Sequence, residues 1–251
     1  MAKRLSKNVM IRVEGLHKEF VLPNQKSDSI KKRITQIFKK RDGGHTYNKA
    51  LDGISFDINR GDFFGIVGRN GSGKSTLLKI ISEIYQPTSG SVTRRGSIVA
   101  FIELGVGFNP QLSGRDNVYL NGAMLGFDRA QVDEMYDDIV AFAELEKFMD
   151  LELKNYSSGM RVRLAFSIAI RADADVLVLD EVLAVGDKAF RAKCYNYFQN
   201  LKDNNKTIIF VTHSMPQVEK YCNKAILIEN GKIAHEGSAS EVAEKYLELF
   251  S

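Results

Sequence analysis

The feature that most constrains this chain is the run of residues 68–75, Gly-Arg-Asn-Gly-Ser-Gly-Lys-Ser. It fits the pattern Gly-x-x-x-x-Gly-Lys-Ser/Thr without a gap. Residues 63–67 before it are apolar and β-prone, and residues 76–81 after it are composed like a helix. The sequence therefore predicts a buried strand, a glycine-rich loop and a helix in direct succession, an arrangement that binds phosphate groups.

The residue types in this run have distinct chemical uses. Glycines let successive backbone N–H groups converge on phosphate oxygens at a helix N-terminus, where partial positive charge also lies. Lys74 is expected to reach the β- and γ-phosphates of ATP, and Ser75 to coordinate Mg²⁺. ATP and Mg²⁺ are therefore the predicted cofactors. The predicted nucleotide-binding residues of the loop are Gly68, Arg69, Asn70, Gly71, Ser72, Gly73, Lys74, Ser75 and Thr76.

Two further apolar runs, residues 176–179 and 207–211, have the length of parallel strands buried on both faces. Between about residues 112 and 172, apolar residues recur at helical spacing with almost no strand signal. These patterns predict a doubly wound α/β core with an all-helical insertion. The other expected elements are strands at 9–20 and 50–57, a hairpin with an Asn-Gly turn at 225–233, and a closing helix at 241–250.

Two carboxylates come directly after the apolar run at residues 176–179. They are Asp180 and Glu181, and open α/β sheets place their ligands at the carboxyl ends of strands. Asp180 is therefore expected to hold Mg²⁺, and Glu181 to act as the general base that polarises the attacking water. The alternative is a pair of solvated loop acids.

Composition and charge limit the setting of the chain. No apolar stretch approaches the roughly 18 residues of a membrane-spanning helix, and the first residues lack the apolar core of a signal peptide. We therefore expect a cytoplasmic protein. Cys194 and Cys222 lack the spacing of a metal site or redox pair, which favours two reduced thiols.

Basic residues are concentrated near the N-terminus. Residues 1–60 carry 14 Lys/Arg against 6 Asp/Glu, although the net charge is only +4. Within them, residues 27–41 combine an apolar stripe at helical spacing with six outward Lys/Arg, which predicts a basic amphipathic helix. We expect it to lie at the anionic cytoplasmic membrane surface rather than on nucleic acid. The alternative is a solvated helix without a partner.

Residues 156–163, Tyr-Ser-Ser-Gly-Met-Arg-Val-Arg, resemble the signature motif of ABC transporter ATPases. The usual form is LSGGQ, of which Ser157 and Gly159 keep their types, whereas Tyr156, Ser158 and Met160 depart. The resemblance implies that Ser157, Ser158 and Gly159 bind the γ-phosphate held by the opposite subunit of a homodimer. The plain structural alternative is a helix start with a serine N-cap.

Two more positions follow the order of motifs in that family. Asp187 matches the D-loop acid and would contact nucleotide, and His213 matches the switch histidine after its strand. The resemblance thus implies Glu181, His213 and Lys74 as catalytic residues. It covers nearly the whole chain, from Val9 to about Phe250.

The match to the family is imperfect at two places. In the family, a glutamine that senses the γ-phosphate usually comes after the strand that follows the phosphate loop. Here Glu103 is the candidate for that position, and its carboxylate would serve as a metal ligand. Gln111 is a weaker candidate for the same position. The aromatic residue that stacks on adenine is either Tyr47 or Phe20, with a slight preference for Tyr47.

The resemblance implies the ABC ATPase fold: a phosphate-loop core with a mostly parallel sheet, an antiparallel β subdomain and an all-helical insertion. We expect a single domain over residues 1–251. Residues 1–111 and 173–251 would form the core and the β subdomain, with the basic insertion at 27–41, and residues 112–172 would form the helical subdomain with the signature.

The signature and the N-terminal insertion are similar to those of exporters of cell-surface polysaccharide, O-antigen or teichoic acid, in the short form without an added carbohydrate-binding domain. The implied partners are a transmembrane permease subunit, a second ATPase subunit and the cytoplasmic face of the inner (cell) membrane, with no nucleic acid. A transporter of another substrate is the alternative. A chromosome-maintenance ATPase would need a long heptad coil, and a ribosome-acting relative would need two cassettes.

Overall fold

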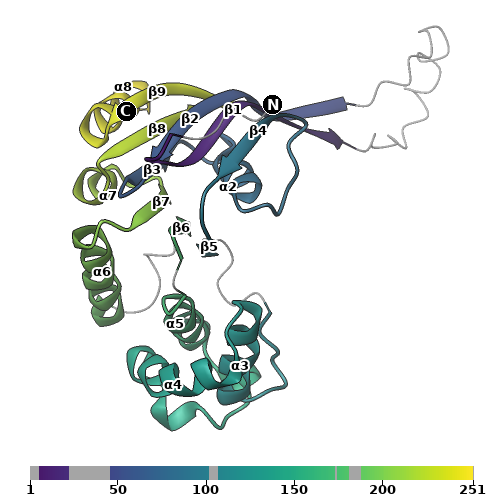
Figure 1. Ribbon diagram of the computed structural model, residues 1–251, viewed down its shortest axis with the longest axis vertical. Helices are drawn as coiled ribbons and strands as arrows, with labels where there is room; N and C mark the ends of the chain where they lie inside the picture. Colours follow the sequence, from purple (N-terminus) through teal and green to yellow (C-terminus); the bar gives the residue numbers. More distant parts are fainter. Residues whose placement is uncertain (1–5, 23–45, 102–106, 173, 181–187, 251) are drawn as a thin grey trace, which may run out of the picture.

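The computed structural model describes residues 6–22, 46–101, 107–172, 174–180 and 188–250 of the chain. The strands lie together in the upper part of Figure 1, and residues 114–169 form a group of helices in the lower part. The predicted basic helix at 27–41 lies outside the described residues.

The larger sheet has six strands in the order β5-β6-β7-β3-β8-β9. Five are parallel, and β9 pairs antiparallel with β8. Their bounds are β3 (Phe63–Val67), β5 (Ile98–Phe101), β6 (Val176–Asp180), β7 (Thr207–Thr212), β8 (Lys224–Glu229) and β9 (Lys232–Ser238). The strands predicted from the apolar runs at 63–67, 176–179 and 207–211 are therefore confirmed.

Successive side chains of these strands enter two different cores. Phe63 packs on one face of the sheet and Phe64 on the other, and the same alternation holds for Leu177 against Val178. This is why the runs are apolar at every position, since both faces are covered.

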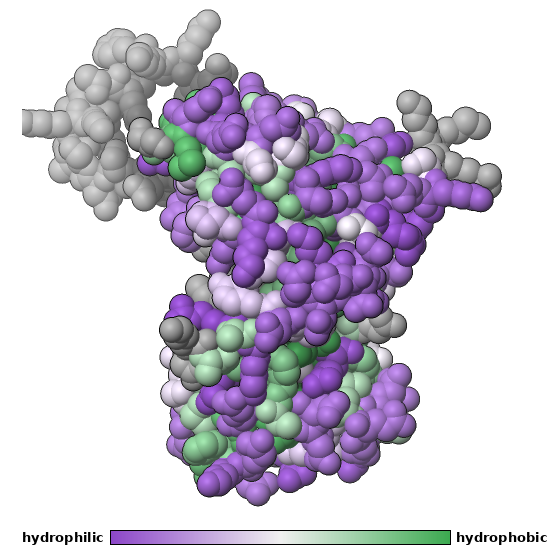
Figure 2. Space-filling view, turned by 90° about the vertical axis from the view of Figure 1, so that its left-hand side faces the viewer, coloured by the Kyte–Doolittle hydropathy of each residue, from purple (hydrophilic) through white to green (hydrophobic). Residues whose placement is uncertain are grey.

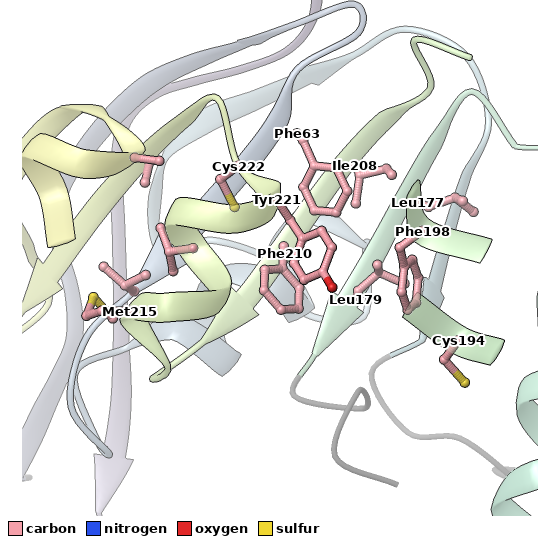
Figure 3. Close-up of a cluster of buried hydrophobic side chains, with 14 of the residues drawn as sticks. Phe63, Leu177, Leu179, Cys194, Phe198, Ile208, Phe210, Met215, Tyr221 and Cys222 are labelled. Carbon is pink, nitrogen blue, oxygen red and sulfur yellow. The ribbon is translucent and has the colours of Figure 1, made fainter. Parts of the chain in front are cut away.

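Helices cover one face of the larger sheet. They are α5 (Ser158–Ala169), α6 (Lys188–Asp203), α7 (Met215–Tyr221) and α8 (Ala239–Phe250). Figure 3 shows this core, in which the Phe63 and Tyr221 rings stack with centroids 6.1 Å apart. Cys194 and Cys222 lie in it as separate buried cysteines.

The opposite face packs against α2 (Lys74–Ile81) and a three-stranded antiparallel sheet in the order β2-β1-β4. The strands are β1 (Val9–Leu22), β2 (Thr46–Asn59) and β4 (Ser89–Arg94). Phe56 of β2 stacks on Phe64 of β3 with ring centroids 5.3 Å apart, which joins the two sheets. The expected strands at 9–20 and 50–57 are confirmed, and both are longer than expected.

The lower group consists of α3 (Gly114–Met124), α4 (Arg129–Ala143) and α5, with short 3₁₀ turns at Glu146–Phe148 and Leu153–Asn155. It has a core of its own, separate from the two cores of the sheet. The predicted helical stretch is thus helical in the structure, and the exact boundaries of a helical subdomain stay a prediction.

The strands β8 and β9 are joined by Asn230 and Gly231, which have φ values of +48° and +76°. Two positive φ angles are what a two-residue hairpin turn requires, so the Asn-Gly prediction is confirmed. In the described part of the chain, no helix has the length and apolar character needed to cross a membrane.

Candidate functional site

The glycine-rich loop connects the end of β3 to the start of α2, where the sequence predicted it. At Gly73, φ is +112°, and an added Cβ would lie 2.5 Å from the Ala50 carbonyl oxygen. At Gly68, an added Cβ would lie 2.3 Å from the Ile228 carbonyl oxygen. The loop is therefore pressed between β2 and β8, and side chains are excluded at both ends of it.

Hydrogen bonds fix the shape of the loop. The Ser72 N–H donates to the Arg69 carbonyl at 3.1 Å, and the Gly231 N–H of the hairpin turn donates to the Ser72 carbonyl at 3.0 Å. Lys74 Nζ donates to the Gly68 and Arg69 carbonyls at 2.8 and 2.9 Å. Lys74 is only 8% exposed, so its positive charge is held against the loop backbone.

The loop fits a phosphate group on two further observations. No side chain caps the first turn of α2, so the backbone N–H groups there have no cap to satisfy them. The Ser72 hydroxyl is buried and makes no hydrogen bond. A buried polar atom of this kind is costly unless a ligand or water completes it, and an anion at the helix start would do so.

The carboxyl ends of β3, β6 and β7 meet at one edge of the sheet. Val67 pairs with Thr212, and Asp180 pairs with Val211, so Gly68, Asp180 and His213 lie along this edge. Neighbouring strands are about 4.8 Å apart. The side chain of Asp180, and all of Glu103, Glu181 and Asp187, lie outside the described residues, so their predicted roles stay predictions.

His213 follows β7 in a turn that is tied to α6. The Thr212 hydroxyl donates to Gln217 Oε1 at 3.2 Å and accepts from the Ser214 N–H at 3.1 Å. Gln217 Nε2 donates to the Tyr195 hydroxyl at 3.1 Å. The result places His213 in the wall of a hollow of about 320 Å³ that Arg69, Asn70 and Tyr246 also line.

Sequence reasoning missed two aromatic residues beside the loop. Tyr246 lines the hollow with His213, and the Phe250 ring lies 5.5 Å from the Arg69 guanidinium carbon. Both are on α8, and the only signal in the sequence is their spacing of four residues, which puts them on one helix face.

The two candidate adenine-stacking residues lie on neighbouring strands. Phe20 pairs with Asn48 and Tyr47 pairs with Val21, so the two rings point to opposite faces of the β1–β2 ribbon. The Phe20 ring meets Tyr85 edge-on at 5.8 Å and Lys18 Nζ at 5.1 Å, whereas Tyr47 is 58% exposed. A single base can therefore stack on only one of them, and Tyr47 stays the preferred prediction.

The signature residues begin α5. Ser157 is its N-cap and accepts a hydrogen bond from the Met160 N–H at 3.2 Å, while Ser158 and Gly159 form the first turn. Ser157 and Ser158 are exposed. Figure 1 shows α5 in the lower part of the molecule and α2 under the β1–β2 ribbon, so the chain does not bring its own signature to its own loop.

Tyr156 departs from the usual signature, and it is packed in the core of the helical group. Its ring is buried, and its hydroxyl donates to the Phe148 carbonyl at 2.8 Å. Burial raises the pKa of Tyr156 to about 12, so this hydroxyl keeps its proton. Gly114 makes room for this hydroxyl because it has no side chain: a Cβ there would lie 2.1 Å from the Tyr156 oxygen.

Comparison with known proteins places these features in a family. The O-antigen export system ATP-binding protein RfbB of Klebsiella pneumoniae is 40% identical over 243 residues, covering 94% of this chain and 97% of that protein. RfbB of Myxococcus xanthus is 48% identical over 202 residues, covering 80% of this chain and 46% of that protein. The teichoic acids export ATP-binding protein TagH of Listeria innocua is 39% identical over 245 residues, covering 98% of this chain and 72% of that protein.

The chain thus spans less than half the length of the Myxococcus relative, and nearly all of the Klebsiella one. Among solved structures, a dimeric ATP-binding cassette in a post-hydrolysis state bound to ADP and Pi matches with a TM-score of 0.71. It is 21% identical and covers 92% of this chain and 99% of that chain, which confirms the predicted ABC ATPase fold. The family model described as ABC transporter matches residues 51–184. This chain belongs to the ABC transporter family.

Proposed function

We propose that this chain is the ATP-binding and ATP-hydrolysing subunit of an ABC exporter, and that it powers export of a lipid-linked cell-surface polysaccharide through a separate transmembrane subunit. The observation that carries the ATPase proposal is the loop, with Lys74 held against its carbonyls and an unsatisfied Ser72 hydroxyl inside it. The relatives named as O-antigen and teichoic acid export proteins support a polysaccharide as the exported substrate.

Binding of ATP follows from the loop. Backbone N–H groups from Gly71 to Ser75 and the Lys74 ammonium bind the β- and γ-phosphates, and Tyr47 stacks on adenine. The residues present also fit Mg²⁺, because Ser75 lies in the first turn of α2 and Asp180 ends β6, and hydroxyl and carboxylate oxygens are ligands that this ion prefers. When bound, the ion would supply positive charge that offsets the negative charge of the phosphates.

Hydrolysis needs a base and an orienting group. Glu181 follows the end of β6 and accepts a proton from the attacking water as its oxygen bonds to the γ-phosphorus and the bond to ADP breaks. His213 follows the neighbouring strand β7 at the same edge of the sheet, and it orients that water against the γ-phosphate. Glu103 would be a further ligand of the ion, and Asp187 would contact the nucleotide.

The active unit is a head-to-tail homodimer. Ser157 and Ser158 are exposed and Gly159 is half-buried, at the start of α5 or in its first turn, in a part of the molecule with its own core. They therefore complete the loop of a second copy rather than their own. The helix start adds partial positive charge toward the γ-phosphate held by that copy.

The chain works at the cytoplasmic face of the inner (cell) membrane, beside its permease. The helical part offers exposed apolar side chains, among them Met124, Phe148 and Leu151, and Figure 2 shows apolar residues at the surface of this part. The basic segment at 27–41 adds attraction to anionic headgroups, at about 1 kcal/mol for each engaged residue.

The test compares Glu181→Gln with Lys74→Ala. Glu181→Gln should bind MgATP, form a dimer that light scattering detects, and lose about 10²–10⁴ in turnover. Lys74→Ala should bind nucleotide weakly and stay monomeric. Near-normal hydrolysis by Glu181→Gln would reassign the base, and absence of an ATP-dependent dimer at high protein concentration would contradict the composite site.

The cargo is tested in cells. A strain that lacks this chain should retain its lipid-linked polysaccharide on the inner leaflet, and expression of the chain should restore surface display. Expression of Glu181→Gln at the same level should not restore it. Normal surface polysaccharide in the deletion strain would favour another cargo.

A further inference from the structure

The end of α8 rests on the phosphate loop. The Tyr246 and Phe250 rings lie one helical turn apart and meet edge-on, with centroids 4.9 Å apart and planes at 63°. Both rings also pack on the core beneath the sheet, which limits their freedom. The Arg69 guanidinium carbon lies 5.5 Å from the Phe250 centroid, within the range of a cation–π interaction.

Arg69 has a second role through its backbone. Its carbonyl oxygen accepts hydrogen bonds from both Lys74 Nζ and the Ser72 N–H, at 2.9 and 3.1 Å. The residue whose side chain rests on α8 is thus the residue whose carbonyl positions the phosphate-binding lysine. Holding the side chain restricts the conformations that its carbonyl can adopt.

Two hollows meet at this contact. One is lined by Phe250, Asn230 and the loop residues, and the other by Tyr246 and His213 together with Arg69 and Asn70. Arg69 and Asn70 line both hollows, so the loop borders open space here, and the contact with Phe250 restrains the Arg69 side chain.

We propose that Phe250, supported by Tyr246, is a positioning residue for the nucleotide site. It holds Arg69 against α8 and so keeps the loop in the shape that accepts the phosphates of a nucleoside triphosphate. Such a residue lowers the ordering cost of binding without touching the ligand. This inference rests on the proposed ATP binding.

The experiment measures the Kd and KM for MgATP with the full chain, using a methylanthraniloyl-labelled ATP for binding. Phe250→Leu removes the ring and keeps the apolar surface, and it should raise Kd and KM about two- to fivefold with kcat unchanged, the usual size of an exposed cation–π interaction. Phe250→Tyr keeps the ring and should bind like the parent. Leu249→Ala is the matched control, because it changes a neighbouring exposed residue of the same helix.

A double-mutant cycle separates positioning from general damage to α8. In an Arg69→Gln background, Phe250→Leu should have no further effect on Kd. If Phe250→Leu loses its fold, Arg69→Lys keeps the charge over the ring and should retain more affinity than Arg69→Gln. Parental Kd in Phe250→Leu, or the same loss in both backgrounds, would overturn the inference. A parent chain that binds no ATP would instead overturn the proposed function.

Discussion

The proposed nucleotide site uses two helix N-termini that are built in opposite ways. The first turn of α2 follows Gly73 and has no side-chain cap, whereas α5 follows Ser157, whose hydroxyl caps it. The loop before α2 is wedged between β2 and β8, while the residues that open α5 are exposed. The start of α2 thus lacks a side-chain cap and is enclosed by neighbouring strands, whereas the start of α5 has a side-chain cap and is exposed to solvent.

This difference follows from what each helix start has to do. An uncapped start leaves N–H groups that a bound anion can satisfy, so the loop before α2 must be shaped by packing from its own chain. The start of α5 is satisfied by Ser157 and keeps its shape without a ligand, so it can be presented to a second copy. Damage to the first should therefore appear in a single chain, and damage to the second only in the dimer.

The largest expected effect is from Gly73→Ala. The added methyl group meets the Ala50 carbonyl at 2.5 Å at a φ of +112°, so both overpacking and backbone strain act on the loop. Together they should raise the Kd for MgATP by about a hundredfold or more, measured by equilibrium fluorescence titration. Gly71→Ala shares the positive φ but meets no atom within 4 Å, and should lose less. Equal losses in the two variants would mean that the wedge against β2 is unimportant.

Gly159→Ala is the corresponding change in the signature. The added methyl group meets only the Ser157 hydroxyl, at 3.9 Å, so folding and ATP binding by the isolated chain should stay within about twofold of the parent. Turnover should fall by about ten- to a hundredfold, because a displacement of about an ångström at a reacting phosphate has that cost. Steady-state hydrolysis at high protein concentration tests this. A Kd that rises as it does for Gly73→Ala would remove the distinction between the two helix starts.

The sequence predicted where the glycine-rich loop lies, between β3 and α2, and where a helix with a serine N-cap begins, at α5. Strands such as residues 176–179 could be predicted because burial on both faces leaves an unbroken apolar run. The loop could be predicted because its glycines are required by backbone geometry that no other residue satisfies.

The unpredicted features are contacts between distant segments. Nothing near Tyr156 in the sequence indicates that it needs Gly114, which lies 42 positions earlier, and nothing near Arg69 indicates Phe250. Such pairs are set by how helices pack, and periodicity reports only which face of a helix is buried. That Phe20 and Tyr47 point to opposite faces of the β1–β2 ribbon likewise follows only from the strand register.

The third prediction tests the packing behind the signature. Gly114→Ala places a methyl group 2.1 Å from the Tyr156 hydroxyl oxygen, which should lower the free energy of unfolding by about 1–3 kcal/mol. Tyr156→Leu removes that oxygen, so the double variant should be no less stable than Tyr156→Leu alone. Urea denaturation of the four proteins measures this. Additive losses would show that the two residues do not share the site.

The smallest expected effect is from Tyr156→Phe. At pH 7 the variant loses the hydrogen bond to the Phe148 carbonyl, which should cost about 1 kcal/mol. The folded-state pKa of Tyr156 is raised from 10.0 to about 12, so the parent's extra stability is fully present below pH 10 and is lost as pH rises toward 12. At about 1.4 kcal/mol for each pH unit above 10, the parent should lose its advantage near pH 11. Unfolding midpoints from pH 7 to 11 test the sign, and a gap that widens with pH would show that the hydroxyl ionises more easily in the folded chain than in the unfolded one.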